Sequence, residues 1–139
     1  MGPLFFRPVY QERVWGGRRL EEELGRELPV RGPIGEAWEL VDRDEAQSVV
    51  RDGPLEGRSL NELWREERQS LFGARAPEAP RFPILVKLLD AADRLSLQVH
   101  PPAAVAARFG GEPKTEMWYI MGASPGAELY VGLRAGVTR

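Results

Sequence analysis

The chain has 139 residues, about the length of one domain, and its 42% hydrophobic and 29% charged residues suffice for a buried core beneath a charged surface. Nineteen basic and 21 acidic residues give a formal net charge of −2, which argues against broad non-specific binding of nucleic acid and against a polybasic membrane patch. The lack of Cys excludes disulfides, thiolate chemistry and cysteine-based zinc fingers, and the single histidine, His100, excludes a three-histidine metal site within these residues.

The first part of the sequence predicts short elements separated by glycines and prolines. We expect helices at residues 18–24 and 59–68, strands at residues 37–41 and 47–51, and a proline-containing loop at residues 73–83. The second helix has the clearest signal, because Ser59 is a candidate N-cap and Glu62 lies three residues later in the capping-box position.

The second part of the sequence favours strands. We expect strands at residues 82–92, 95–100, 115–121 and 128–133, and a short helix at residues 101–109. Residues 95–100 alternate between apolar and polar side chains, and the last two strands are separated by a Ser-Pro-Gly turn. Many short strands with few helices predict a mainly β fold, a sandwich or barrel.

Alternation along a strand places Ser96, Gln98 and His100 on one face, opposite an apolar face. The same rule puts Lys114 and Glu116 on one face of the next strand. If the two strands are close, Gln98, His100 and Glu116 offer an amide oxygen, an imidazole nitrogen and a carboxylate, a set that suits a divalent metal. On pattern alone, a hydrogen-bonded structural histidine and an ordinary exposed glutamate explain the same residues.

The two lysines of the chain lie in different sequence surroundings. Lys87 interrupts an apolar strand, where a charge costs several kcal/mol unless it is paired or faces a polar cavity, although its side chain could also extend to the surface. On pattern alone, a simple ion pair with Glu116 is a sufficient explanation of Lys114.

Two further residues are weaker candidates. Trp15, before two glycines, is a candidate for a pocket wall or a packed aromatic, and Glu36 is more easily explained as solvated.

At these residues the sequence resembles the type I phosphomannose isomerases in their shorter bacterial form. The stretches that carry the resemblance lie in the family's order: ERVWGG at 12–17, PIGEAWE at 33–39, FPILVKLLDA at 82–91, LSLQVHP at 95–101 and KTEMWYI at 114–120. The pairing of LSLQVHP with KTEMWYI is the most specific of these features.

The resemblance implies a cupin-type jelly roll of antiparallel strands with two or three short helices and one zinc ion. It implies that Gln98, His100 and Glu116 are zinc ligands. It implies active-site positions for the catalytic candidate Lys114 and for the substrate-binding candidates Lys87, Ser96, Trp15 and Glu36. The activity implied is the interconversion of mannose 6-phosphate and fructose 6-phosphate; the alternative is a non-catalytic cupin module that binds a sugar or a partner chain.

Members of that family are much longer, and their fourth zinc ligand is a downstream histidine, expected here beyond Arg139. We therefore expect residues 1–139 to be the N-terminal part of a catalytic domain, with little turnover alone and with exposed strand edges that favour self-association. No apolar run approaches the ~18–20 residues of a membrane helix and no signal-peptide layout begins the chain, so we expect a cytoplasmic protein that binds a small sugar phosphate, without nucleic acid or membrane partners.

Overall fold

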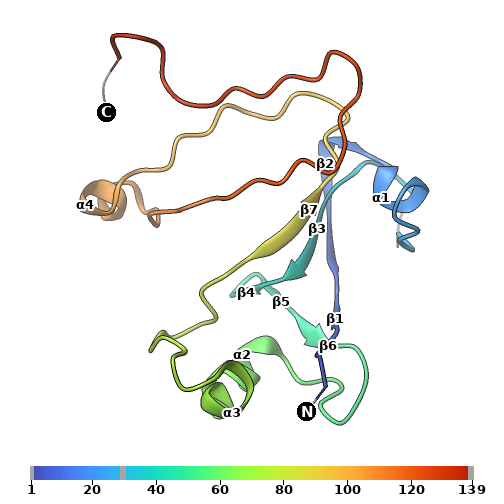
Figure 1. Ribbon diagram of the computed structural model, residues 1–139, viewed down its shortest axis with the longest axis vertical. Coiled ribbons are helices and arrows are strands. Elements are labelled where there is room, and N and C mark those ends of the chain that lie inside the picture. Colours follow the sequence, from blue (N-terminus) through green and yellow to red (C-terminus); the bar gives the residue numbers. More distant parts are fainter. Residues whose placement is uncertain (1, 29–30, 138–139) are drawn as a thin grey trace. The chain divides into compact units, whose positions relative to one another are not determined.

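The computed structural model describes residues 2–28 and 31–137. By its internal contacts the chain forms two compact units, Met1–Ser96 and Leu97–Arg139 (Figure 1). The strands lie in the first unit and all of them pair antiparallel, and the helices are short. The predicted mainly β class is therefore confirmed, and it is consistent with a cupin-type fold.

The first unit is built on a three-stranded sheet. Its order is β2 (Val9–Gly17), β3 (Ile34–Leu40) and β7 (Val86–Leu89), with β3 in the middle. Leu20, Ile34 and Ala37 form a buried cluster on this sheet. Two-stranded pairs flank it: β1 (Phe6–Arg7) with β6 (Val49–Val50), and β4 (Asp42–Arg43) with β5 (Ala46–Gln47).

Strand β2 leaves its regular register in a bulge at residues 13–16. Both Glu12 and Gly17 pair with Ile34, so the four residues between them have no paired position on β3. The bulge needs glycine on both strands, because a Cβ at Gly16 would overlap the backbone at Gly35 and a Cβ at Gly35 would lie 2.6 Å from the Cβ of Arg13. The two backbones can approach closely only because neither residue has a side chain.

Helix α1 (Arg19–Glu22) begins directly after β2, within the predicted 18–24. Its Arg19 amide donates to the Asp90 carboxylate beyond β7, over 2.7 Å. A Cβ at Gly17 would lie 2.6 Å from that carboxylate oxygen, so glycine leaves the space that Asp90 fills.

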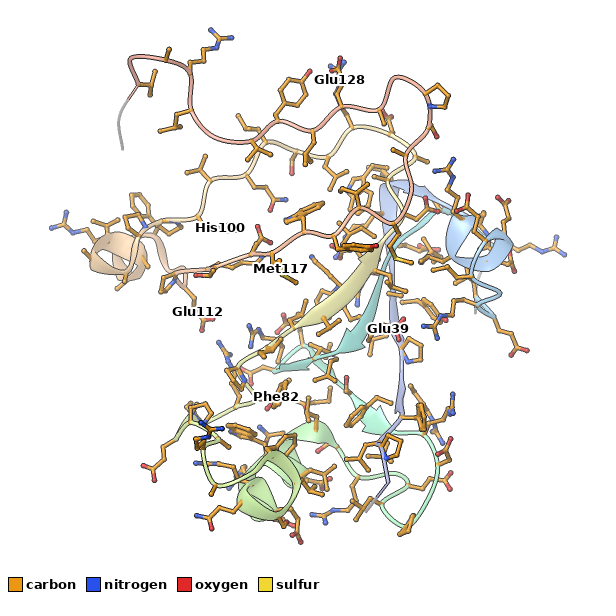
Figure 2. The ribbon with its side chains drawn as sticks, viewed as in Figure 1. Glu39, Phe82, His100, Glu112, Met117 and Glu128 are labelled. Atoms are coloured by element: carbon orange, nitrogen blue, oxygen red, sulfur yellow. The ribbon has the colours of Figure 1, made fainter. Side chains whose placement is uncertain are left out.

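The predicted helix at 59–68 is confirmed as α2 (Leu60–Glu66), and the expected capping box is present between Ser59 and Glu62. A further helix, α3 (Arg68–Phe72), was not predicted. The ring of Trp64 packs edge to face against Phe72 and against Phe82, and the rings of Phe72 and Phe82 are tilted against each other. Figure 2 labels Phe82. This aromatic cluster anchors the chain just before it enters β7.

The second unit contains helix α4 (Ala103–Ala106), a 3-10 turn at Ala107–Phe109, and extended chain. The helix predicted at 101–109 is confirmed, and Gly110 ends it with a φ of 61°. The strands predicted at 95–100, 115–121 and 128–133 are wrong, because none of the described residues there joins a hydrogen-bonded ladder. A strand requires a partner backbone, and the apolar side chains of these stretches are exposed rather than packed, as at Met117 with 91% of its surface exposed.

The earlier strand predictions are confirmed in part. The strand expected at 37–41 is the end of β3, the strand at 47–51 contains β6, and the strand at 82–92 shortens to β7. Among the described residues, no helix is both long and apolar enough to cross a membrane.

Candidate functional site

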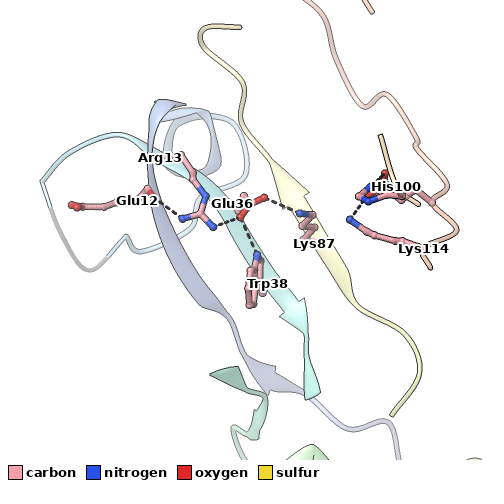
Figure 3. Close-up of polar contacts among 8 residues, drawn as sticks. Glu12, Arg13, Glu36, Trp38, Lys87, His100 and Lys114 are labelled. Atoms are coloured by element: carbon pink, nitrogen blue, oxygen red, sulfur yellow. Dashed lines mark hydrogen bonds and ion pairs between the residues drawn. The ribbon is translucent and has the colours of Figure 1, made fainter. Parts of the chain in front are cut away.

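Glu36 is the centre of a polar network on the first unit's sheet (Figure 3). Its side chain is 8% exposed and lies between two cations. Lys87 Nζ donates to Glu36 Oε1 over 2.8 Å, while Arg13 Nη2 donates to Oε2 over 2.8 Å. The indole of Trp38 donates to the same Oε2 over 3.2 Å, so both carboxylate oxygens are engaged.

Each member of this network is placed by the backbone. Trp38 of β3 pairs directly with Lys87 of β7, and Glu36 lies two residues from Trp38 on the same strand. Arg13 comes from the β2 bulge, and its Nη1 also donates to the Glu12 carbonyl over 3.0 Å. The ladder between β3 and β7 fixes the backbones that carry Glu36, Trp38 and Lys87 more firmly than loops would.

The network decides whether Lys87 is paired or only extends to the surface. Its side chain is 24% exposed and forms an ion pair with Glu36, which offsets the free-energy cost of placing a charge within an apolar strand. The pattern-based interpretation of Glu36 as solvated is wrong, because the residue is 6% exposed.

Electrostatics keep Glu36 ionised. Burial is the largest single effect and raises its pKa, but the hydrogen bond and charge of Lys87, the hydrogen bond of Trp38 and the charge of Arg13 together outweigh it. The pKa of Glu36 therefore lies below the ordinary range for a glutamate.

Trp15 lies in the same bulge. A Cβ at Gly35 would be 2.7 Å from its ring, so the indole packs over the backbone of β3 immediately before Glu36. Ser96 is exposed at the end of the first unit. The substrate-binding roles of both residues stay predictions.

In the second unit, Glu116 contacts both His100 and Lys114, the two residues of this cluster that Figure 3 labels. Glu116 Oε2 lies 3.2 Å from His100 Nε2, and Glu116 Oε1 accepts from Lys114 Nζ over 2.6 Å. The hydrogen bond from Lys114 lowers the pKa of Glu116; the charge of Lys114 and the contact with His100 add to this, against the opposing effect of burial. The expected approach of His100 to Glu116 is thus present, although neither residue lies in a strand.

The donor atoms of this cluster fit a divalent ion. Two ligands of one tetrahedral zinc ion, each about 2.0–2.2 Å from the metal, lie roughly 3.3–3.6 Å from each other. The 3.2 Å between His100 Nε2 and Glu116 Oε2 is the length of a hydrogen bond between the two side chains and lies just below that separation. Within the described residues, no three His, Cys, Asp or Glu side chains are grouped to hold a metal, and the predicted ligand role of Gln98 stays a prediction.

Two residues of the Glu36 network, Arg13 and Trp38, were not predicted from the sequence. Trp38 had a usable signal, because it lies two positions from Glu36 and so shares its side of the strand. Arg13 had none, because the bulge breaks the alternation that would have placed its side chain.

Comparison with known proteins gives one consistent result. Residues 4–116 match a family model described as phosphomannose isomerase type I, catalytic domain. A probable mannose-6-phosphate isomerase of Bacillus subtilis, GmuF, is 41% identical over 135 residues, covering 96% of this chain and 42% of that protein. A mannose-6-phosphate isomerase of Streptococcus mutans is 42% identical over 134 residues, covering 96% of this chain and 41% of that protein.

A solved structure agrees. The crystal structure of the mannose 6-phosphate isomerase from Bacillus subtilis matches with a TM-score of 0.69 and 38% identity, over 78% of this chain and 33% of that one. The chain thus spans about two fifths of the length of the curated relatives that it matches, at 41–42%.

Proposed function

The chain belongs to the type I phosphomannose isomerase family, and on that premise we propose that the protein interconverts mannose 6-phosphate and fructose 6-phosphate. Supporting this is the cluster in which one carboxylate, Glu116, lies 3.2 Å from an imidazole nitrogen and 2.6 Å from an ammonium. Proton transfer between neighbouring sugar carbons requires such a group of proton-bearing and charge-stabilising side chains.

We assign the metal-binding role to Gln98, His100 and Glu116. The proposed ion is zinc, and a further histidine ligand is expected outside these residues. When bound, a divalent ion supplies Lewis acidity that favours negative charge on the sugar oxygens.

The chain's own residues have separate tasks in this proposal. Lys114 is the proposed catalytic group: it can hold or release a proton beside the sugar, and its contact with Glu116 fixes its position. The reaction passes through a cis-enediol: the aldose loses a proton from C2 and gains one on the C1 oxygen, and the enediol then loses the proton of its C2 hydroxyl and gains one at C1. Lys87 and Ser96 are proposed to bind the phosphate, where a compact ammonium and a hydroxyl are suitable donors.

Trp15 and Glu36 support substrate binding in different ways. Trp15 is proposed to form an apolar wall that limits access of water. Glu36 has both oxygens engaged by protein donors, so we assign it to the site through Lys87 rather than through a sugar hydroxyl. A cytoplasmic location is part of the proposal.

Metal content and turnover test the proposal together. We expect about one zinc per chain and isomerisation of mannose 6-phosphate in the full-length protein, and both Glu116→Gln and His100→Ala to weaken zinc binding by at least about tenfold. Glu128→Gln is the matched control, because Glu128 is also exposed in the second unit and also accepts a side-chain hydrogen bond, from Tyr130.

The possible results separate the alternatives. Zinc binding that is equal in Glu116→Gln and Glu128→Gln would contradict the metal assignment. Sugar binding without turnover in zinc-loaded protein would favour the non-catalytic cupin module. Residues 1–139 alone are expected to show little turnover, and measurable isomerisation by that purified chain would overturn this part of the proposal.

A further inference from the structure

The Glu36 network carries an uncompensated positive charge. Lys87 and Arg13 each contact one oxygen of the same buried carboxylate, over 2.8 Å in both cases. Two cations and one anion leave a net charge of about +1, whereas an ordinary ion pair would be neutral. The side chains of Lys87 and Arg13 are 24% and 36% exposed, so this charge is accessible from solvent while Glu36 is not.

Arg13 is what distinguishes this cluster from a plain lysine–glutamate pair. Its guanidinium is held at two points, by Glu36 Oε2 and by the Glu12 carbonyl, and therefore has a defined position. With Oε2 occupied by Arg13 and Trp38, Lys87 contacts Glu36 through Oε1 alone. That contact uses one of the three N–H donors of an ammonium.

We propose that Arg13 and Glu36 are positioning residues for an anion-binding Lys87: Glu36 fixes the direction of Nζ, and Arg13 keeps the cluster positive so that it attracts a phosphate monoester dianion. A neutral Lys–Glu pair would orient the ammonium equally well but would offer a dianion little net attraction. This inference deepens the proposed function and rests on it for the identity of the anion as the phosphate of a sugar phosphate.

Charge-changing variants of Arg13 test the inference. Arg13→Met removes the charge with little loss of side-chain length, and Arg13→Lys keeps the charge while reducing the number of donors. Arg26→Met is the matched control, because Arg26 forms a comparable 3.0 Å ion pair with Glu39 on the same strand as Glu36, with similar exposure. All three variants thus alter an arginine that pairs with a β3 glutamate.

The first readout is binding of inorganic phosphate, which is monitored by NMR of protein labelled with ¹³C at lysine Cε. This chain has two lysines, and Lys87→Arg identifies the signal of Lys87. We expect phosphate to shift that signal, the phosphate Kd to rise about tenfold in Arg13→Met and to stay within about threefold in Arg13→Lys, and Arg26→Met to match the wild type.

The second readout is steady-state kinetics of the full-length, zinc-loaded protein. Arg13→Met should raise KM for mannose 6-phosphate by a similar factor with kcat nearly unchanged, because the lost attraction acts equally on substrate and transition state. A role of Arg13 confined to holding the β2 bulge would instead lower the Tm and leave the phosphate Kd unchanged.

Three results would overturn the inference: no phosphate response of Lys87 in the wild type, equal phosphate affinity in Arg13→Met and Arg26→Met, or equal loss in Arg13→Lys and Arg13→Met. Failure of the proposed function has a different signature. Phosphate binding that depends on Arg13 without any isomerisation would leave the anion site standing and reject the isomerase.

Discussion

At the scale of single residues, the ion pairs of Glu36 make the free energy of unfolding depend on pH. Its pKa is depressed in the folded chain, so the folded state holds this proton less tightly than the unfolded state does. The resulting stabilisation is fully present above the ordinary glutamate pKa of about 4.3 and is lost as the pH falls through the lower folded value. We therefore expect the free energy of unfolding to decrease as the pH is lowered below about 5.

The comparison with Lys87→Met isolates this contribution from that of the other carboxylates. The variant removes the hydrogen bond and the charge that most lower the pKa of Glu36, so its stability should depend less steeply on pH. Urea denaturation from pH 3.5 to 7 measures both profiles. Parallel profiles would show that the contact between Lys87 and Glu36 contributes nothing to the acid sensitivity.

At the scale of elements, Asp42 joins three parts of the first unit. This buried carboxylate of β4 accepts hydrogen bonds from Gln47 of β5 over 2.7 Å, from Asn61 of α2 over 3.0 and 3.1 Å, and from the Phe82 amide over 2.7 Å. It thereby fixes the hairpin, the helix and the entry to β7 to one another. All of its partners are donors, which suits an acceptor-only carboxylate.

The Asp42→Asn substitution should destabilise the first unit. An amide has one oxygen, and its NH₂ group would face donors, so at least one buried donor loses its partner at a cost of about 1–3 kcal/mol. Asp44→Asn, the same change in the exposed turn two residues later, should be nearly neutral. Urea denaturation at neutral pH compares the two, and equal stabilities would contradict the joining role of Asp42.

Elements with local signals were predicted most completely, whereas strands, which depend on distant partners, were confirmed only in part at 37–41, 47–51 and 82–92 and were wrong at 95–100, 115–121 and 128–133. The capping box at Ser59 and the glycine at 110 lie within a few residues of the helices that they begin and end, and both helices are present. The alternation at 95–100 is equally regular, but a strand forms only when another backbone pairs with it. In the candidate site both contacts join residues distant in sequence: His100 and Glu116 meet as expected, whereas Arg13 reaches Glu36 from a bulge that no pattern reveals.

At the scale of the whole molecule, the two units differ in what holds their backbones. In the first unit, ladders join strands far apart in sequence, as β3 and β7 are. In the described part of the second unit, the backbone hydrogen bonds join residues of the same helix or turn, such as the Ala127 amide with the Ser124 carbonyl. Large apolar side chains there are also exposed, including 89% of Leu97 and 84% of Val131.

This difference predicts two levels of protection in native-state hydrogen exchange of residues 1–139. Amides of β3 and β7 exchange only when the sheet opens, whereas amides at 115–121 and 128–133 have no ladder to break and should exchange near the rate of an unfolded chain. Amides of α4 provide an internal reference, since they have helical hydrogen bonds within the same unit. Protection at 115–121 above roughly 100-fold corresponds to an opening free energy of about 2.7 kcal/mol and would contradict the prediction. Such protection would show that these stretches have paired with other strands, as in self-association through exposed edges.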